Sequence, residues 1–527
     1  MNMLPRRSLL AGLALMPMSR IAQGAVARRL TILHINDLHS RHEPVDARAL
    51  TCRADLARDG CFGGVARVAT ALAAERIAAE AQGRTVLLLD AGDQFQGSLF
   101  YTAWKGDVEL AVMHALGTEA MAVGNHEFDS GPANLARFVA AAKFPVLSAN
   151  VDASAEPNLA GKLQPHVMIE KAGLKIGIVG LTTLEAVSGS SPGPLVKFNP
   201  PGPVLAASAA ALKAQGADLV IALSHLGVAL DVALAGTVPG VDVFVGGHSH
   251  TLLSDREPGA LGPAHQAVLG AAGVAVVVQA ACFGRYIGRL DLDLDADGRP
   301  VAYGGDVRHV GLDLPEEPKV AAIVAAYAAQ LDLVRKRVIG QTAAPIDNAA
   351  CRNGECPLGN FITDAMLATV HGADIAILNA GGIRTGLPGG TITMGDVLTM
   401  LPFSNTVATV TLTGADVVAA LANGVTRAGA GGFPQIGGAR MVWNAEARHV
   451  ESVELRQPDG TFAAIDPVKR YRVATNNFMR AGGDGYTVMR DHGIDPYDAG
   501  ASMEDAVMAA FGRGTAPGAL EGRIVGK

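Results

Sequence analysis

Five short segments in the first half of the chain carry residue types that bind transition metals. These segments are Asp37-Leu38-His39, Asp93, Asn125-His126-Glu127, His225 and His248-Ser249-His250. Carboxylate and amide oxygens mixed with imidazole nitrogens suit Zn, Mn or Fe better than Ca. Two such ions about 3.5–4 Å apart can hold a water and a phosphate group together and stabilise both the attacking and the leaving oxygen. These residues therefore favour hydrolysis of a phosphoester at a two-metal centre.

Each segment alone is a weak signal. An Asp and a His after a strand are more often satisfied polar groups than metal ligands, and GHSH alone could be a packed loop. Asn125 is more suggestive, because Asn is an uncommon ligand and the glycine before it lets the loop approach closely. Five such pieces in order, each after a strand-length apolar run, make coincidence a poor explanation.

The apolar runs before these segments are typical of buried strands. They read LTILHIN, TVLLLD, MAVG, VIALS and VFVG, and helical stretches such as GGVARVATALAAERIAAEAQ separate them. Alternation of strands and helices predicts an α/β layered fold for residues 28–314. Ligands gather at the carboxyl ends of strands in open α/β sheets, so we expect the five segments to converge on one crevice.

Residues 315–340 predict a helix that connects two domains. Pro315 opens this segment, acidic residues lie in its first turn and basic residues precede Gly340. The remainder, 341–527, restarts with its own helices and strands, among them PLGNFITDAMLATV and ADIAILNAGG. The chain length of 527 residues suggests about three to four domains, but two large domains account for it.

The first 27 residues predict an export signal. Arg6 and Arg7 precede an apolar run at 9–18 that is too short to span a membrane, and AVA at 25–27 matches a cleavage site. The paired arginines resemble a twin-arginine signal, and an ordinary secretory signal is the alternative. We expect a periplasmic or secreted protein, exported by the twin-arginine machinery, with no membrane span in the mature chain.

An oxidising location bears on the five cysteines. Cys52 with Cys61 and Cys351 with Cys356 are close pairs that suit local disulfides. Cys282 is left over, and its apolar surroundings favour a buried, inert thiol. A zinc site built from four cysteines is the alternative, which the spacings and the lack of nearby histidines disfavour.

Composition excludes several classes of protein. With 49% hydrophobic and 18% charged residues, the chain is not intrinsically disordered. The 43 basic and 50 acidic residues give a net charge of −7, and no basic block stands out, so we expect no nucleic acid polymer as a partner. A small phosphorylated molecule can still bind where metal ions reverse the local field.

The motifs taken together resemble those of a known family. D-x-H, G-D, G-N-H-E, a lone His after a strand and G-H-x-H resemble the calcineurin-like metallophosphoesterases. GNHEFDSG, joined to a C-terminal segment with GGIR, PFSN and NNFMRAGGDGY, is similar to the 5'-nucleotidase family. The resemblance covers essentially the whole mature chain. It implies an α/β, four-layer, sandwich-like metallophosphoesterase domain, with sheets flanked by helices, and a smaller α+β substrate domain.

The resemblance also implies two divalent metal ions, Zn, Mn or similar, and assigns their ligands. One ion would be held by Asp37, His39 and His250, the other by Asn125, His225 and His248, with Asp93 as the bridge. His126 would stabilise phosphate charge in the transition state. Asp129 would pair with His126 and fix its tautomer. Some family members have Gln at the position of His250, which is a mild departure.

In the C-terminal domain the resemblance implies a set of substrate-binding residues. They are Arg352, Arg384, Phe403, Asn405, Phe478 and Asp484. The two phenylalanines would sandwich the base, the acid would bind the ribose hydroxyls and Asn405 would contact the base edge. The planar fork of an arginine suits phosphate or carboxylate groups. Arg480 is a further candidate that the family pattern does not clearly predict.

The leading hypothesis is a 5'-nucleotidase that uses a metal-bound water to release phosphate from nucleoside 5'-monophosphates, with UDP-sugars as further substrates. The alternatives are a 2',3'-cyclic-nucleotide 2'-phosphodiesterase/3'-nucleotidase, a sulfur-oxidation thiohydrolase and a non-catalytic nucleotide-binding protein. The aromatic pair Phe403 and Phe478 favours a nucleoside over a sulfonate-bearing substrate. A non-catalytic nucleotide-binding protein would need neither His126 nor Asp129. Resemblance further implies closure by rotation of the domains about the 315–340 helix.

Overall fold

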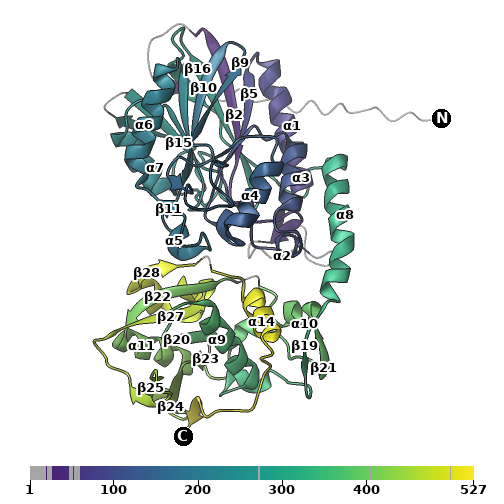
Figure 1. Cartoon of the computed structure of the whole chain (residues 1–527), viewed down its shortest axis with the longest axis vertical. Helices are drawn as coiled ribbons and strands as arrows, with labels where there is room; N and C mark the ends of the chain where they lie inside the picture. Colours follow the sequence, from purple (N-terminus) through teal and green to yellow (C-terminus); the bar gives the residue numbers. More distant parts are fainter. Residues whose placement is uncertain are drawn as a thin grey trace, which may run out of the picture.

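The computed structural model of the chain describes residues 19–20, 26–46, 52, 60–270, 273–403, 405–498 and 500–527. Most of the expected export signal, residues 1–27, lies outside this range. In the described part, no helix is both long enough and apolar enough to cross a membrane. The chain forms an upper and a lower domain, with one long helix along their side (Figure 1).

Two sheets form the centre of the first domain. The larger sheet contains β17 (Pro300–Gly304), β16 (Tyr286–Leu294), β2 (Arg28–Ile35), β5 (Thr85–Asp90), β6 (Ala120–Ala122) and β7 (Val146–Leu147). The other contains β14 (Gln266–Gly270), β15 (Gly273–Val278), β13 (Val243–Gly246), β12 (Leu219–His225), β10 (Leu174–Thr182) and β9 (His166–Lys171). The run β2–β5–β6–β7 is parallel, as is β10–β12–β13–β15. The two sheets bury their facing side chains in one apolar cluster.

Helices cover the outer faces of both sheets. Helices α1 (Val65–Ala81) and α3 (Asp107–Leu116) lie on the side of the first sheet, and α6 (Pro201–Ala214) and α7 (Val228–Thr237) on the second (Figure 1). Apolar clusters fill the space between helices and sheets. The order helix, sheet, sheet, helix confirms the predicted four-layer architecture.

Short elements line the end of this domain that faces the second one. They are β3 (Pro44–Asp46), β4 (Cys61–Gly63), α2 (Leu99–Trp104), α4 (Gly131–Ala141), β8 (Val151–Asp152), α5 (Ala186–Gly189) and β11 (Lys197–Phe198). Several follow the carboxyl ends of the parallel strands, where loops must leave the sheets. The predicted functional segments lie in these same loops.

Helix α8 (Pro318–Arg335) occupies most of the segment expected to connect the domains. It packs against α1, α2 and α3 through Val320, Leu331 and the ring of Tyr327, which meets Trp104 edge-on. The Glu317 carboxylate accepts a hydrogen bond from the Val320 backbone N–H and so caps the first turn. The helix thereby remains attached to the first domain while its end reaches the second (Figure 1).

The second domain contains a mixed five-stranded sheet and a smaller four-stranded one. The first runs β23 (Pro434–Gly437), β20 (Ile375–Asn379), β27 (Arg470–Asn476), β22 (Val407–Thr413) and β28 (Ile494–Tyr497). The second runs β26 (Phe462–Ala464), β25 (His449–Arg456), β24 (Ala439–Asn444) and β29 (Ile524–Gly526). The strands β19 (Val338–Thr342) and β21 (Gly390–Thr393) pair separately.

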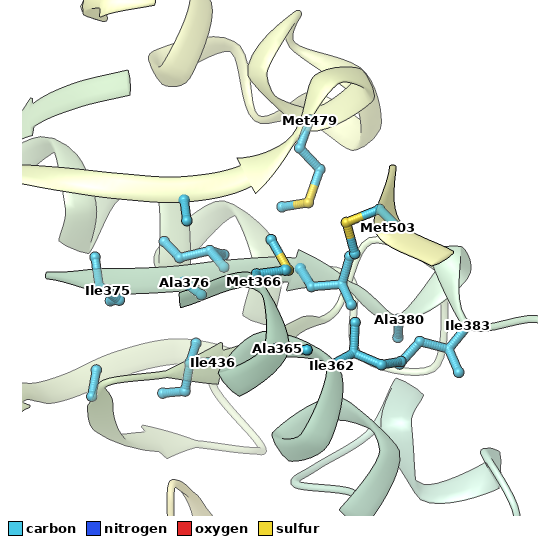
Figure 2. Packing of buried hydrophobic residues seen from close by; sticks show 14 of the residues in the cluster. Ile362, Ala365, Met366, Ile375, Ala376, Ala380, Ile383, Ile436, Met479 and Met503 are labelled. Carbon is cyan, nitrogen blue, oxygen red and sulfur yellow. The ribbon is translucent and has the colours of Figure 1, made fainter. Parts of the chain in front are cut away.

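In the described part of this domain, the sheets are accompanied by the helices α9 (Pro357–Thr369), α10 (Met394–Met400), α11 (Gly414–Val425), α12 (Asn477–Arg480), α13 (Thr487–Asp491) and α14 (Met503–Gly512). Figure 2 shows Ile362, Ala365 and Met366 of α9 beside Ile375 and Ala376 of β20, in the main core of the domain. The segregation of mixed sheets and helices confirms the predicted α+β class.

Both expected disulfides are present. Cys52 bonds to Cys61 and Cys351 bonds to Cys356. The alternative prediction of a zinc site built from these four cysteines is therefore wrong. Cys282 is free, but it is half-buried rather than buried, because its loop lies beside His250 at the rim of the functional cavity.

Candidate metal centre

The seven side chains predicted to bind metal lie together at the carboxyl ends of the parallel strands. Asp37 and His39 follow β2, Asp93 follows β5, Asn125 follows β6, His225 ends β12, and His248 and His250 follow β13. Ligand atoms of Asp37, His39 and His250 lie within 4.8 Å of one another, and so do those of Asp93, His225 and His248. These two groups correspond to the two predicted ligand sets, apart from Asn125, which lies buried beside them, and a third group joins His39 and Asp93 to His126.

Asp93 stands between the two groups. Its Oδ2 is 3.0 Å from His225 Nε2 and 3.8 Å from His39 Nε2. On the other side, His39 Nε2 is 3.1 Å from His250 Nε2, which is 3.3 Å from Asp37 Oδ1. One carboxylate can therefore serve both groups, as a bridging ligand must.

The backbone at this site is unusual. Asp37, His39, Asp93, His248 and His250 all have φ between 49° and 73°, in the left-handed region that side chains other than glycine rarely adopt. Such residues cost free energy and cluster at functional sites, where the surrounding structure enforces them. Five of the seven predicted ligands thus sit on loops shaped to aim side chains inward.

Glu127 holds two of these loops together. Its buried carboxylate accepts hydrogen bonds from the backbone N–H groups of Gly124, Asp93, Gln94 and Phe95. Burial, together with the neighbouring Asp93 charge, raises the pKa of Glu127 to about 7. The sequence marked this residue within GNHE without giving it a role, and only the contacts identify it as a positioning group.

The orphaned polar atoms of the site test whether a cation fits. His225 Nδ1 is 2.7 Å from the Ala91 carbonyl and donates to it, so the lone pair of a neutral ring at Nε2 points at Asp93 Oδ2. His225 Nε2 and Asn125 Oδ1 are both buried without a hydrogen-bond partner. The atoms His225 Nε2 and Asp93 Oδ2 are thus two acceptors that face each other at 3.0 Å, and they require a proton or a cation between them. The donor set of oxygens and imidazole nitrogens therefore fits divalent metal ions.

His126 and Asp129 form a separate pair beside the ligands. His126 Nδ1 lies 2.7 Å from Asp129 Oδ2, and the His126 backbone N–H donates to Asp93 Oδ1. Burial works to lower the pKa of His126, but the carboxylates of Asp129 and Asp93 prevail and raise it to about 9. A positively charged imidazole held in this orientation can stabilise negative charge on a phosphate.

A cavity of about 610 Å³ separates the metal groups from the second domain. On the side of the first domain, its lining includes His39, Asp93, Asn125 and His126. On the side of the second domain, it includes Phe403 and Asn405. The structure therefore brings two of the six predicted substrate-binding side chains to the metal centre.

The other four predicted substrate-binding residues lie outside that lining. Arg384 stacks over the Phe403 ring with its guanidinium carbon 5.5 Å from the ring centre. Phe478 is 46% exposed and covers Gly483, and Asp484 accepts a hydrogen bond from Asn379. Arg352 is exposed on the disulfide loop.

Several cavity residues were not found from the sequence. Arg480, noted only as a further candidate, forms a two-point ion pair with Asp498 at the cavity wall. Tyr497 also lines the cavity, and Glu185 Oε2 lies 3.1 Å from His248 Nε2. Arg480 lies within the NNFMRAGGDGY motif, whereas Glu185 and Tyr497 lie outside every motif, so no sequence signal separated those two residues from ordinary surface positions.

Comparison with known proteins connects this geometry to a family. Residues 30–252 match the model of the calcineurin-like phosphoesterases, and residues 338–491 match that of the 5'-nucleotidase C-terminal domain. A human 5'-nucleotidase is 34% identical over 511 residues, covering 89% of this chain and 87% of that protein. This chain belongs to the 5'-nucleotidase family. The predicted resemblance is confirmed, as is the class of enzyme, a metal-dependent phosphoric monoester hydrolase of the metallophosphoesterase type.

Two further proteins extend the comparison. The trifunctional nucleotide phosphoesterase YfkN of Bacillus subtilis is 35% identical over 78% of this chain, which spans only 30% of the length of that protein. The structure of Haemophilus influenzae NAD nucleotidase matches with a TM-score of 0.81 and 26% identity, covering 95% of this chain and 99% of the other. The similarity therefore includes both domains.

Proposed function

We propose that this protein is an exported 5'-nucleotidase that releases phosphate from nucleoside 5'-monophosphates with two divalent metal ions. The observation that carries the proposal is one cavity with metal-ligand groups on one wall and Phe403 with Asn405 on the other. The wall of ligands suits a phosphate, and the aromatic and amide groups suit a nucleoside. The 5'-nucleotidase from human is a relative along most of both chains.

The positions of the residues support a proposed role for each. Asp37, His39 and His250 would hold one ion and Asn125, His225 and His248 the other, with Asp93 between them. When bound, such ions activate a water near neutral pH and neutralise charge on the phosphate oxygens. His126 would donate a hydrogen bond to the phosphate from its free Nε2, while Asp129 keeps the proton on Nδ1 and fixes the ring.

Substrate recognition would require a movement of the second domain. Arg352, Arg384, Phe478 and Asp484 lie outside the lining of the metal cavity, although Arg384 and Phe403 are in contact. We propose that rotation about the segment 315–340 turns this surface toward the metals. The second aromatic ring would then complete a sandwich around the base.

Export is part of the proposal. Two disulfides are typical of proteins in oxidising compartments, and the predicted twin-arginine signal would direct the chain to the periplasm or outside the cell.

The choice among phosphoesters calls for a direct test. Phosphate release should be measured with AMP, 2',3'-cyclic AMP and UDP-glucose, each with added Mn, Zn or Co. The proposal expects AMP to have the highest kcat/KM. Preference for the cyclic ester would favour the 2',3'-cyclic-nucleotide phosphodiesterase, and metal-dependent AMP binding without turnover would favour a binding protein. Turnover of a thiosulfonate in place of all three would favour the thiohydrolase.

A further inference from the structure

One loop carries a ligand for each of the two proposed ions. The loop of residues 247–251 follows β13, and it places His248 in one ligand group and His250 in the other. Both residues have a left-handed backbone, with φ of 73° and 52°. This conformation costs free energy in residues other than glycine, so contacts from outside the loop must hold it in this shape.

The rings of His225 and His250 are held in different ways. The His225 side chain is fully buried at the end of β12, and its Nδ1 donates a hydrogen bond of 2.7 Å to the Ala91 carbonyl. The His250 side chain is 37% exposed, so packing against neighbours fixes less of its surface. The direction of the His250 ring therefore depends more strongly on the backbone of its loop.

The side chain of Gln279 contacts this loop at its start, middle and end. Gln279 directly follows β15 and is only 1% exposed. Its Nε2 donates a hydrogen bond of 2.6 Å to the Gly247 carbonyl, and its Oε1 accepts one of 2.5 Å from the Thr251 backbone N–H. The same Oε1 accepts a hydrogen bond of 2.9 Å from the Ser249 hydroxyl, between the two histidines. One amide group therefore spans the whole loop.

The contacts of Gln279 explain why an amide suits this position. The Gly247 carbonyl needs a donor and the Thr251 N–H needs an acceptor, and an amide offers both from one uncharged, planar group. Buried backbone polar groups that lose their partners are unfavourable. An apolar side chain at position 279 would therefore leave both ends of the loop unsatisfied, and the loop would have to rearrange.

The main chain around Gln279 is itself fixed. The Gln279 carbonyl accepts a hydrogen bond of 3.3 Å from the Leu253 N–H, just beyond the loop. The buried Asn36 side chain accepts a hydrogen bond of 3.1 Å from the Ala280 N–H and donates one to the Ala281 carbonyl. The amide of Gln279 thus projects from a segment that is anchored on both sides, as a support for a strained loop must be.

We propose that Gln279 is the positioning residue that sets the directions of His248 and His250, and thereby the affinity for both ions. The inference deepens the proposed function, because it rests on the two-ion site stated there. Gln279 would act through the backbone of the loop and not as a ligand. Since His248 and His250 belong to different ligand groups, loss of the Gln279 amide should weaken the binding of both ions together.

The test is a calorimetric titration of the metal-free full chain with Mn or Zn alone. Gln279→Met keeps the approximate length of the side chain and removes its three hydrogen bonds to the loop. Loss of a group that orients metal ligands costs about tenfold to a hundredfold in metal affinity, so the Kd of each ion should rise by that factor. The metal concentration that gives half-maximal phosphate release from AMP should rise in parallel.

Gln435→Met is the matched control. Gln435 is a fully buried amide of the second domain, which donates to the Cys351 and Gly354 carbonyls and accepts from the Cys356 N–H. Because it supports the disulfide loop, its loss should lower stability in denaturant unfolding to a similar extent. The Kd of either ion should change by less than about twofold. An equal rise of Kd in both glutamine variants would mean a general loss of structure and would overturn the inference.

Ser249→Ala is a milder variant that decides the matter if Gln279→Met does not fold. It removes one hydrogen bond to Gln279 and should raise the Kd of the ions by about twofold to tenfold. An unchanged Kd in whichever of these variants folds, or a rise for one ion alone, would overturn the inference. A parent chain that binds two ions without hydrolysing AMP would contradict the proposed function alone, because the titration would still report on Gln279. A parent chain that binds no ion would contradict both.

Discussion

The two walls of the interdomain cavity differ in how completely they are assembled. On the wall of the first domain, the predicted metal ligands come together within one set of loops at the ends of parallel strands. On the wall of the second domain, Phe403 and Asn405 line the cavity while Phe478 and Asp484 do not. Under the proposed function, metal binding would depend on contacts inside one domain, whereas substrate recognition would also depend on how the second domain is turned. Substitutions in the first wall should therefore impair metal binding, whereas substitutions in the second should impair substrate recognition.

The largest effect is expected from Asp93→Asn. Asp93 lies between both ligand groups, so its loss should weaken the hold on both ions and remove several kcal/mol of charge stabilisation from the transition state. We expect kcat for AMP to fall by roughly a thousandfold. An assay of phosphate release measures the fall in kcat, and the metal content of the variant measures the weaker binding of the ions. Asp297→Asn, in an exposed turn, is the control, and normal turnover by the Asp93 variant would break the assignment of the metal wall.

His126→Ala should have the next largest effect. Removing one group that stabilises developing charge costs roughly a hundredfold to a thousandfold in kcat. Metal content should remain that of the parent chain, because His126 is not among the proposed ligands. A loss of metal together with activity would instead place His126 in the ligand set.

Asp129→Asn tests the same wall more gently. The variant keeps the shape of the pair but removes the charge that fixes the His126 ring. Changes to groups that orient a metal-site residue typically cost about tenfold to a hundredfold in activity. A loss as large as that of His126→Ala would mean that Asp129 acts on the substrate directly.

Phe403→Ala and Phe478→Ala separate the two walls. Stacking on an aromatic ring contributes about 1–3 kcal/mol per base, so each variant should raise KM for AMP by roughly tenfold with a small change in kcat. Phe403 lines the cavity and Phe478 does not, so an equal effect of both would support rotation of the second domain. An effect confined to Phe403 would contradict it.

Removing the Cys351–Cys356 disulfide should have the smallest effect on chemistry. The bond closes a loop with a sequence separation of 5, and the chain-entropy argument gives about 2 kcal/mol of stability for so short a loop. Denaturant unfolding of the Cys351→Ser/Cys356→Ser variant measures this. A marked rise in KM for AMP in the folded variant would show that the disulfide also directs Arg352.

The sequence was informative where function depends on residue type after a strand. The strand-end pattern predicted Asp37, Asp93 and His225 as neighbours, because parallel strands end at the same edge of a sheet. It did not reveal that the Glu127 carboxylate would accept hydrogen bonds from four backbone N–H groups, or that Arg480 would pair with Asp498. Those properties depend on tertiary contacts between segments far apart in the chain.

The orientation of the second domain was equally hidden from the sequence. The motifs around Phe403 and Phe478 gave no indication that only one ring would line the cavity. The left-handed backbone at His248 and His250 was also unforeseen, because this conformation is uncommon for any residue other than glycine. Local sequence patterns thus identified the chemical groups. The strained backbone at these groups and their access to substrate could be recognised only in the three-dimensional structure.

The proposed function requires two metal ions on one wall of the cavity to drive release of phosphate from a nucleotide. Its most direct test is to strip the protein of metal and measure phosphate release from AMP while Mn, Zn or Co is added back in known amounts. We expect negligible release from the stripped protein and a rise that reaches a plateau near two equivalents of metal per chain. Release that is unaffected by stripping, or that reaches its plateau at one equivalent, would contradict it.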